Sequence, residues 1–265
     1  KYRYHLKLAS PKPEPIYFVY GTIVHKIAEL YVESKGSQSI IDITNDIVTR
    51  KIPVEEDRFC PDLPEEYKKK LNKHVKAIQN LTDKVGCDGI VEHEFLYDLD
   101  PPNNKCAKGF IDRLILRDKD GKTCDGHEVK AEKAFIIDYK TTKKGKLRVN
   151  ADTVKKDLQL RTYARIVQKE FGIPAHNIKA ALYYLDGENL IGAQYSEESL
   201  NDVEKELLTA FNMIQKSDPD KVWGRVGWHC KTCDYENICP FNKSGAGESK
   251  WDGNIENLGH DGWQE

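Results

Sequence analysis

Apolar residues near the start of the chain repeat with the period of an α-helix. In the segment GTIVHKIAELYVE, Ile23, Ile27, Leu30 and Tyr31 recur three or four positions apart, after the proline-rich stretch SPKPEP. This spacing predicts an amphipathic helix over residues 17–32. The same periodicity predicts further helices over residues 64–81, 153–171 and 200–214.

Between the second and third of these helices the pattern changes to short apolar runs typical of β-strands. The runs are IVEHEFLYDL (90–99), KGFIDRLILRD (108–118), AFIIDYKTT (134–142) and, later, KAALYYLDG (179–187). Asp-Gly pairs at 120–121 and 125–126 mark turns between the second and third runs. The sequence therefore predicts an α/β fold, in which a small central mixed β-sheet is flanked by helices, without internal repeats.

Composition narrows the class of protein. A chain of 265 residues with a formal net charge of -2 is long enough for a substantial core and is not basic as a whole. Its apolar runs are shorter than a membrane span, and its start does not resemble a signal peptide. We therefore expect a cytoplasmic protein, in which any nucleic-acid surface would be a local basic patch.

Cysteine usage indicates a metal or cluster site near the C-terminus. Of seven cysteines, Cys230, Cys233 and Cys239 are grouped in WHCKTCDYENICPF, whereas the other four are scattered and read as ordinary thiols. Structural disulfides are rare in the cytosol, so grouped cysteines point to bound metal. Three thiolates with His229 as a fourth ligand would suit zinc.

The segment FIIDYKTTKK ends a buried strand in charged residues. Strand alternation places Asp138 and Lys140 on one face, which is typical of a salt-bridged strand end. The preceding strand carries Asp112, and pairing of the two strands, across the inserted DKDGKTCDGHEVKAEK, would bring the carboxylates together. Two carboxylates with room for water suit Mg²⁺, and an adjacent lysine can orient an attacking water. Glu94, on the first strand, reads as a solvated residue.

A basic segment follows the proposed catalytic lysine. Residues 139–156 hold seven basic side chains and one acidic side chain. Charged runs are usually solvated loops, but beside a metal site such a loop also suits a phosphate backbone. The chain carries no sequence-reading module such as a helix-turn-helix, so we expect cleavage without strong sequence preference.

Four motifs occur together in the order used by a known family. They are GTIVHKIAE around His25, G-x-x-D ending at Asp112, D-x-K from Asp138 to Lys140, and Q-x-x-x-Y from Gln159 to Tyr163. In this order the chain resembles PD-(D/E)XK nucleases of the RecB and Cas4 type, over residues 21–239. The resemblance implies a restriction-endonuclease-like fold and a DNA substrate.

The same resemblance implies roles for individual residues. His25, Asp112, Asp138 and the main-chain carbonyl of Tyr139 would ligate Mg²⁺ or Mn²⁺, and Lys140 would activate water. Gln159 and Tyr163 would contact DNA near the cleavage site, because their spacing places them on one face of a helix.

The resemblance also bears on the cysteines. Nucleases of this type often hold a [4Fe-4S] cluster with three cysteines in the form C-x2-C-x5-C-P and one before the N-terminal helix. Cys230, Cys233 and Cys239 match the first part, and we expect the fourth ligand upstream of Lys1. The cluster, favoured over zinc, would clasp the ends of a single nuclease domain, residues 1–240, followed by an extended polar tail, residues 241–265.

Three functions follow as hypotheses. The leading one is a Mg²⁺- or Mn²⁺-dependent deoxyribonuclease, more an exonuclease than an endonuclease, in recombination, repair, phage DNA metabolism or CRISPR adaptation, with a possible helicase or recombination partner. The second is an inactive DNA-binding or scaffold subunit of a helicase–nuclease complex. The third is a metal-clasped interaction protein. The complete set of acids and lysine favours the first.

Overall fold

The computed structural model describes residues 14–55, 58–142, 149–218, 230 and 233. Chain contacts divide the protein into two units, of which Ile16–Phe211 is the larger and holds the sheet and its helices. The other unit joins Lys1–Pro15 to Asn212–Glu265, and only a few of its residues are described. No helix in the described part of the chain has the length and apolar character needed to cross a membrane.

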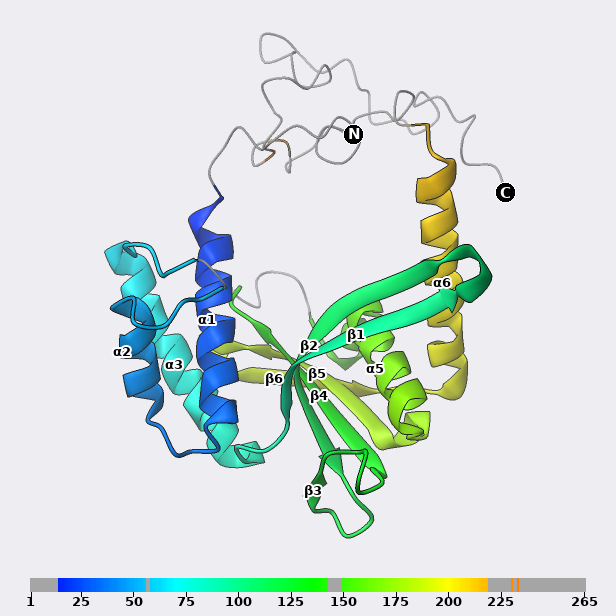
Figure 1. The fold of residues 1–265 in the computed structure, drawn as a ribbon, viewed down its shortest axis with the longest axis horizontal. Helices are drawn as coiled ribbons and strands as arrows, with labels where there is room; N and C mark the ends of the chain where they lie inside the picture. The colour runs from blue at the N-terminus through cyan, green and yellow to red at the C-terminus, as the bar shows by residue number, and fades with distance from the viewer. Residues whose placement is uncertain (1–13, 56–57, 143–148, 219–229, 231–232, 234–265) are drawn as a thin grey trace. The chain divides into compact units, whose positions relative to one another are not determined.

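The centre of the larger unit is a mixed sheet in the order β1-β2-β4-β5-β6, with β3 paired to β2. β4 and β5 run parallel, and the other neighbours are antiparallel. This arrangement (Figure 1) confirms the predicted mixed α/β fold and is consistent with a restriction-endonuclease-like fold. The strands are β1 Ile90–Asp100, β2 Lys105–Arg117, β3 Thr123–Cys124, β4 Lys133–Lys140, β5 Ile178–Tyr184 and β6 Asn189–Gln194.

Helices cover the two faces of the sheet and bury a core on each. Ile115 of β2 and Ile137 of β4 pack with other apolar residues against α1–α3. Their neighbours in the strands, Leu114 and Ile136, pack on the opposite face, against α5. Strand alternation explains this division, because neighbouring residues point to opposite faces. The helices are α1 Ile16–Glu33, α2 Ile40–Val48, α3 Glu65–Val85, α4 Ala151–Lys155, α5 Leu158–Phe171 and α6 Glu197–Lys216.

Three details differ from the sequence-based expectation. The helix predicted over 153–171 is two helices, because the Asp157 side chain accepts a hydrogen bond from the main-chain N–H of Leu160 and caps α5 as a new helix. The strand predicted over 179–187 ends at Tyr184 in a 3₁₀ turn, η3 Leu185–Gly187. The elements α2 and β6 were not anticipated.

The β1–β2 hairpin twists at the point where β2 stops pairing with β4. Ile111 and Leu114 lie three positions apart, on opposite faces of a regular strand, yet both are buried in the core against α5. At the same level Glu92 adopts a positive φ of 46°. Val91 pairs with Arg113 and His93 with Ile111, so Glu92 falls opposite Asp112. The twist therefore brings two carboxylates to one point.

The β2–β4 ladder stops just before the acidic residues. Its last pair is Arg113 with Ile137, so the next position places Asp112 opposite Asp138. β4 and β5 are parallel, and Lys140, the last residue of β4, pairs with Tyr184, the last residue of β5. The η3 turn that follows β5 therefore lies at the same end of the sheet as Lys140. The long connection after β2 lies at the other end of the ladder, beyond the pair Arg117 and Lys133, and leaves this register intact.

A buried arginine ties β2 to the end of α3. The Arg113 guanidinium is fully buried and donates to the main-chain carbonyls of Gly86 and Asp88. We expect Arg113→Met to lower the free energy of unfolding by about 2 kcal/mol, because it removes hydrogen bonds made by a buried, charged donor. Urea unfolding measures the change. The partly exposed Arg117→Met is the matched control, and an equal loss in both variants would contradict this role.

Candidate active site

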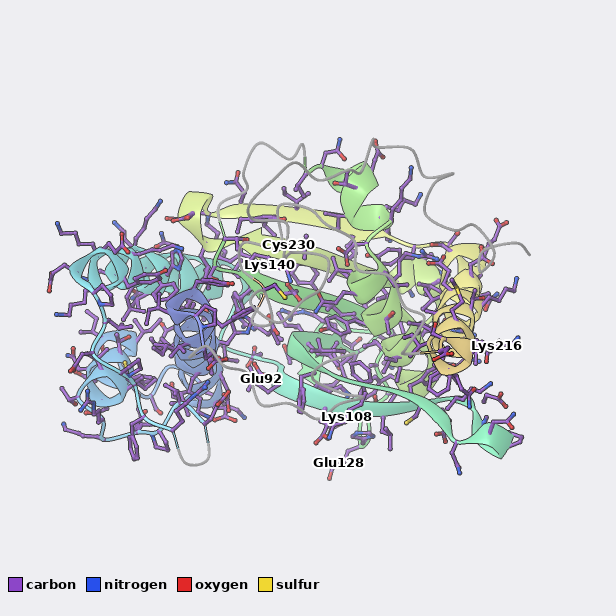
Figure 2. All side chains as sticks on the ribbon, turned by 90° about the horizontal axis from the view of Figure 1, so that it is seen from above. Glu92, Lys108, Glu128, Lys140, Lys216 and Cys230 are labelled. Atoms are coloured by element: carbon purple, nitrogen blue, oxygen red, sulfur yellow. The ribbon has the colours of Figure 1, made fainter. Side chains whose placement is uncertain are left out.

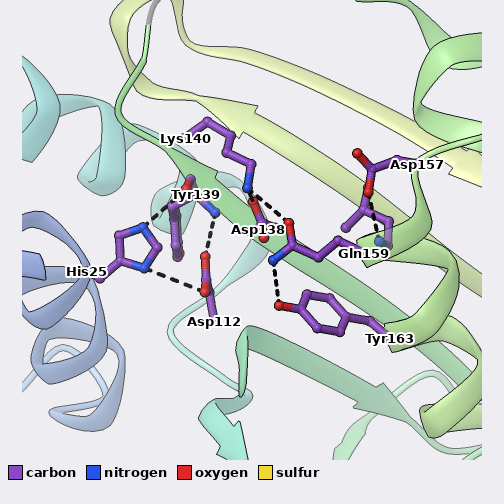
Figure 3. Close-up of polar contacts among 9 residues, drawn as sticks. His25, Asp112, Asp138, Tyr139, Lys140, Asp157, Gln159 and Tyr163 are labelled. Carbon is purple, nitrogen blue, oxygen red and sulfur yellow. Dashed lines mark hydrogen bonds and ion pairs between the residues drawn. The ribbon is translucent and has the colours of Figure 1, made fainter. Parts of the chain in front are cut away.

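Asp112 stands at the centre of a polar cluster between α1 and α5 (Figure 3). Its Oδ2 accepts a hydrogen bond from the main-chain N–H of Tyr139 at 2.7 Å, and its Oδ1 lies 3.5 Å from Nδ1 of His25. The side chain thus replaces a ladder bond where β2 and β4 separate. Both oxygens are fixed in position by this arrangement.

His25 reaches the cluster from the middle of α1. Its Nε2 lies 3.2 Å from the main-chain carbonyl oxygen of Tyr139, so each ring nitrogen faces an acceptor. Burial lowers the pKa of His25, but the hydrogen bond and charge of Asp112 outweigh it and raise the pKa to about 9. Without metal, His25 is therefore a cation held between Asp112 and Tyr139.

Glu92 is a functional candidate that sequence reasoning missed. Ligand atoms of His25, Glu92 and Asp112 all lie within 4.8 Å of one another, whereas Glu94 is exposed and pairs with Lys108. Viewed from above, Glu92 lies beside α1 while Lys108 projects from the hairpin (Figure 2). A non-glycine residue with positive φ inside a strand is strained, and such strain is common at functional sites. Only the register of β1 against β2 would have revealed it.

Charge at the cluster is crowded. Burial raises the pKa of Glu92 from 4.5 to about 7, and repulsion from Asp112 adds to the effect. Burial and Asp112 likewise raise the pKa of Asp138, which is only 2% exposed. Carboxylates in this state gain most from a bound cation, because each is costly to ionise alone.

Lys140 is paired with the neighbouring acid. Its Nζ lies 2.6 Å from Oδ2 of Asp138 and donates to Oε1 of Gln159 at 3.2 Å. Burial lowers the pKa of Lys140, but the Asp138 charge outweighs burial and the pKa is raised. The lysine therefore remains a cation at neutral pH. The salt-bridged strand end expected from the sequence is present, within a larger cluster.

Gln159 and Tyr163 share one face of α5, as their spacing predicts. The Gln159 amide donates to the Tyr163 hydroxyl at 2.8 Å, and the ring of Tyr163 packs edge-on against Phe95. Gln159 is exposed, whereas Tyr163 is only 7% exposed. Tyr163 is placed to hold the Gln159 amide, and the amide is the part of the pair that faces outward.

The donor set fits a hard divalent cation. Carboxylate oxygens of Glu92 and Asp112 with one imidazole are ligands that Mn²⁺ accepts readily, and carboxylates with water suit Mg²⁺. The main-chain carbonyl of Tyr139 lies at the same cluster through its contact with His25. Asp138 lies on β4 opposite Asp112, just beyond the last β2–β4 pair, and forms an ion pair with Lys140.

Several residues singled out in the sequence lie outside the described residues: His229, Cys239, residues 143–148 of the basic segment, and the tail. Of the cysteine motif, the structure describes Cys230 and Cys233, and the main-chain N–H of Cys233 donates to the carbonyl of Cys230 at 3.1 Å. The other four cysteines form no disulfide with one another.

Comparison with known proteins identifies the family. The PD-(D/E)XK nuclease superfamily matches residues 1–240, and the chain belongs to this superfamily. No curated protein matches the chain. Among solved structures, a crystal structure of SSO0001 aligns over 85% of this chain and 96% of that chain, with 15% sequence identity and a TM-score of 0.38.

The raised pKa of Glu92 predicts a pH-dependent stability. The folded, metal-free protein retains a proton on Glu92 up to about pH 7, whereas the unfolded chain releases it near 4.5, so stability falls as pH rises between these values. Glu92→Gln removes this cost. In EDTA at pH 8 we expect it to raise the free energy of unfolding by about 1 kcal/mol, less than the full shift implies because solvent screens the partly exposed group.

Urea unfolding at pH 5 and pH 8 measures this effect. At pH 5 the gain should largely disappear, because Glu92 is then protonated in the parent as well. Glu94→Gln, on the exposed face of the same strand, is the matched control and should show no such pH dependence. A gain of equal size at both pH values would show that Glu92 is not held neutral by its surroundings.

Proposed function

We propose that the chain is a Mg²⁺- or Mn²⁺-dependent deoxyribonuclease that cleaves without sequence preference and acts as an exonuclease on DNA ends or single strands. The observation that carries this proposal is the convergence of Asp112, Asp138 and Lys140 at the point where β2 and β4 separate. Membership of a nuclease superfamily supports hydrolysis of phosphodiester bonds. The DNA substrate and the exonuclease mode rest on the resemblance described above.

Each residue has a distinct task in the proposed reaction. His25, Glu92, Asp112, Asp138 and the Tyr139 carbonyl are the candidate ligands of the metal, which would polarise the phosphate and lower the pKa of a water. Since Lys140 is a cation, it orients the attacking water and offsets negative charge on the phosphate. Gln159 fixes the Lys140 ammonium from α5 and presents its amide to the DNA.

The cysteine motif belongs to the proposal as a structural clasp. Cys230, Cys233 and Cys239, with a fourth ligand from outside this motif, would hold a [4Fe-4S] cluster, for which zinc is the alternative. Hydrolysis requires no electron transfer, so the cluster would act on folding alone. A role in recombination, repair, phage DNA metabolism or CRISPR adaptation, with a helicase or recombination partner in the cytoplasm, is proposed on resemblance.

The test is digestion of end-labelled linear single- and double-stranded DNA in Mn²⁺, with closed circular DNA alongside. An exonuclease shortens the linear substrates progressively from an end and leaves the circles intact. Nicked or linearised circles would instead identify an endonuclease. A folded protein that binds DNA and digests neither form would be the inactive scaffold subunit.

Removal of the Lys140 ammonium should affect chemistry rather than DNA binding. We expect Lys140→Ala to lower the cleavage rate by roughly 10²–10⁴-fold, because the group stabilises charge that develops only in the transition state. The rate is measured in single turnover and DNA binding by anisotropy. Lys179→Ala, exposed on β5, is the control. Equal loss of binding and rate in Lys140→Ala would assign Lys140 to substrate binding alone.

Metal binding should depend on Glu92 and not on Glu94. By calorimetry, Glu92→Gln should weaken Mn²⁺ binding by at least about 10–100-fold, because that loss is typical even for a group that only supports a metal ligand, and Glu92 is a candidate ligand itself. In the parent, affinity should fall as pH drops below about 9, where a proton on His25 begins to compete with the ion, and more steeply below about 7, where a proton on Glu92 competes as well. Unchanged affinity in Glu92→Gln would exclude Glu92 from the site.

A further inference from the structure

Beside the catalytic cluster, on the α3 side of β4, lies a second polar site that the reaction does not use. A surface pocket of about 410 Å³ is lined by Glu66, Tyr67, Lys70 and Lys73 of α3 and by Asp186 of η3. It lies at the same sheet edge as the catalytic residues, because η3 follows the strand β5 whose last residue, Tyr184, pairs with Lys140.

Lys70 links this pocket directly to the catalytic strand. Its ammonium donates to the main-chain carbonyl of Thr141, the residue after Lys140, at 2.9 Å and lies over the ring of Tyr20 at 5.2 Å. These contacts leave further N–H donors on the ammonium for a ligand. Lys70 is thus a cation held in position against Thr141, the first residue after the catalytic strand β4.

The acid in the pocket lies beneath the lysines. Asp186 is 11% exposed and is held by Nε2 of His74 at 3.2 Å, while the Tyr20 hydroxyl lies 3.0 Å from the other nitrogen of that ring. Lys73 lies 3.5 Å from the Asp186 carboxylate but is 58% exposed. The Asp186 carboxylate is thus mostly buried and partnered by His74, while the Lys73 ammonium remains accessible to a ligand. The pocket lining alone carries two lysines and two acids, so any excess of positive charge comes from neighbouring lysines on α3.

The cationic surface extends along α3. Spacings of three and four residues place four lysines on one stripe of the helix, and the acidic residue within the stripe is Glu66. We name this stripe the α3 lysine surface, and it consists of Lys69, Lys70, Lys73 and Lys76. Lysine-rich helix faces are often only solvated. Here the position beside Thr141 and the pocket favour a ligand.

We propose that the α3 lysine surface binds the phosphate backbone of the DNA strand being cut, with one phosphate seated between Lys70 and Lys73. This inference rests on the proposed nuclease function and adds to it a path for the strand, from the cluster at Asp112 past Thr141 to α3. Lysines neutralise phosphates as point charges, so this contact is independent of base sequence.

The test is the salt dependence of single-stranded DNA binding, measured by anisotropy in Ca²⁺ so that the DNA remains uncut. For the double variant Lys70→Ala/Lys73→Ala we expect a Kd about tenfold higher at low salt, and a slope of log K against log salt smaller in magnitude by about 0.7, the contribution of the one single-strand phosphate that these two lysines hold. Lys119→Ala, in the exposed turn after β2 at the opposite sheet edge, should match the parent.

A second variant guards against an effect on folding. Lys69→Ala/Lys73→Ala/Lys76→Ala leaves the Lys70 contact with Thr141 intact and should also reduce the slope. Parent-like Kd and slope in both variants, or a higher Kd with an unchanged slope, would overturn the inference while the nuclease assignment stands. A folded parent that neither binds nor cuts DNA would overturn the proposed function, and this inference with it.

Discussion

The hydrogen bond from the Tyr139 main-chain N–H to Asp112 is the contact on which the cluster depends. It occupies the place where the β2–β4 ladder would continue after Arg113 and Ile137. A side chain in place of a main-chain carbonyl lets the strands separate without leaving the N–H unsatisfied. The gap so formed is where the carboxylates of Asp112 and Asp138 meet, and where His25 reaches the Tyr139 carbonyl.

The charged side chains in this gap determine its affinity for a cation. The carboxylates of Glu92, Asp112 and Asp138 share it with the cations His25 and Lys140, and burial raises the pKa of two of the acids. In the metal-free protein a histidine proton offsets part of this charge. A divalent ion would relieve the same repulsion more completely, so the features that destabilise the metal-free site are those that favour metal binding.

Much of this arrangement could be predicted from the sequence. The helix with His25, the strands with Asp112 and Asp138, and the helix with Gln159 and Tyr163 follow from local periodicity, and motif order then joins them. Glu92 could not be found in this way, because its position depends on the twist of the hairpin opposite Asp112. That twist is a tertiary feature, set by packing of β1 and β2 against α5.

Local sequence patterns also fail to predict several features of the fold for the same reason. The division of the predicted 153–171 helix arises from one side-chain cap at Asp157, which a periodic apolar pattern does not register. Helix α2 is short, and β6 is a half-buried strand at the edge of the sheet, so both give weak periodic signals. The pocket at Lys70 depends on the contact between α3 and Thr141, 71 positions apart in sequence.

The most direct test of Asp112 as the centre of a metal site is anomalous diffraction from crystals soaked in Mn²⁺. At this cluster we predict a strong Mn²⁺ peak at bonding distance from an Asp112 oxygen, with His25 and Glu92 also within ligand distance. No peak at saturating Mn²⁺, or a peak that the Asp112 carboxylate does not ligate, would contradict this account of the cluster.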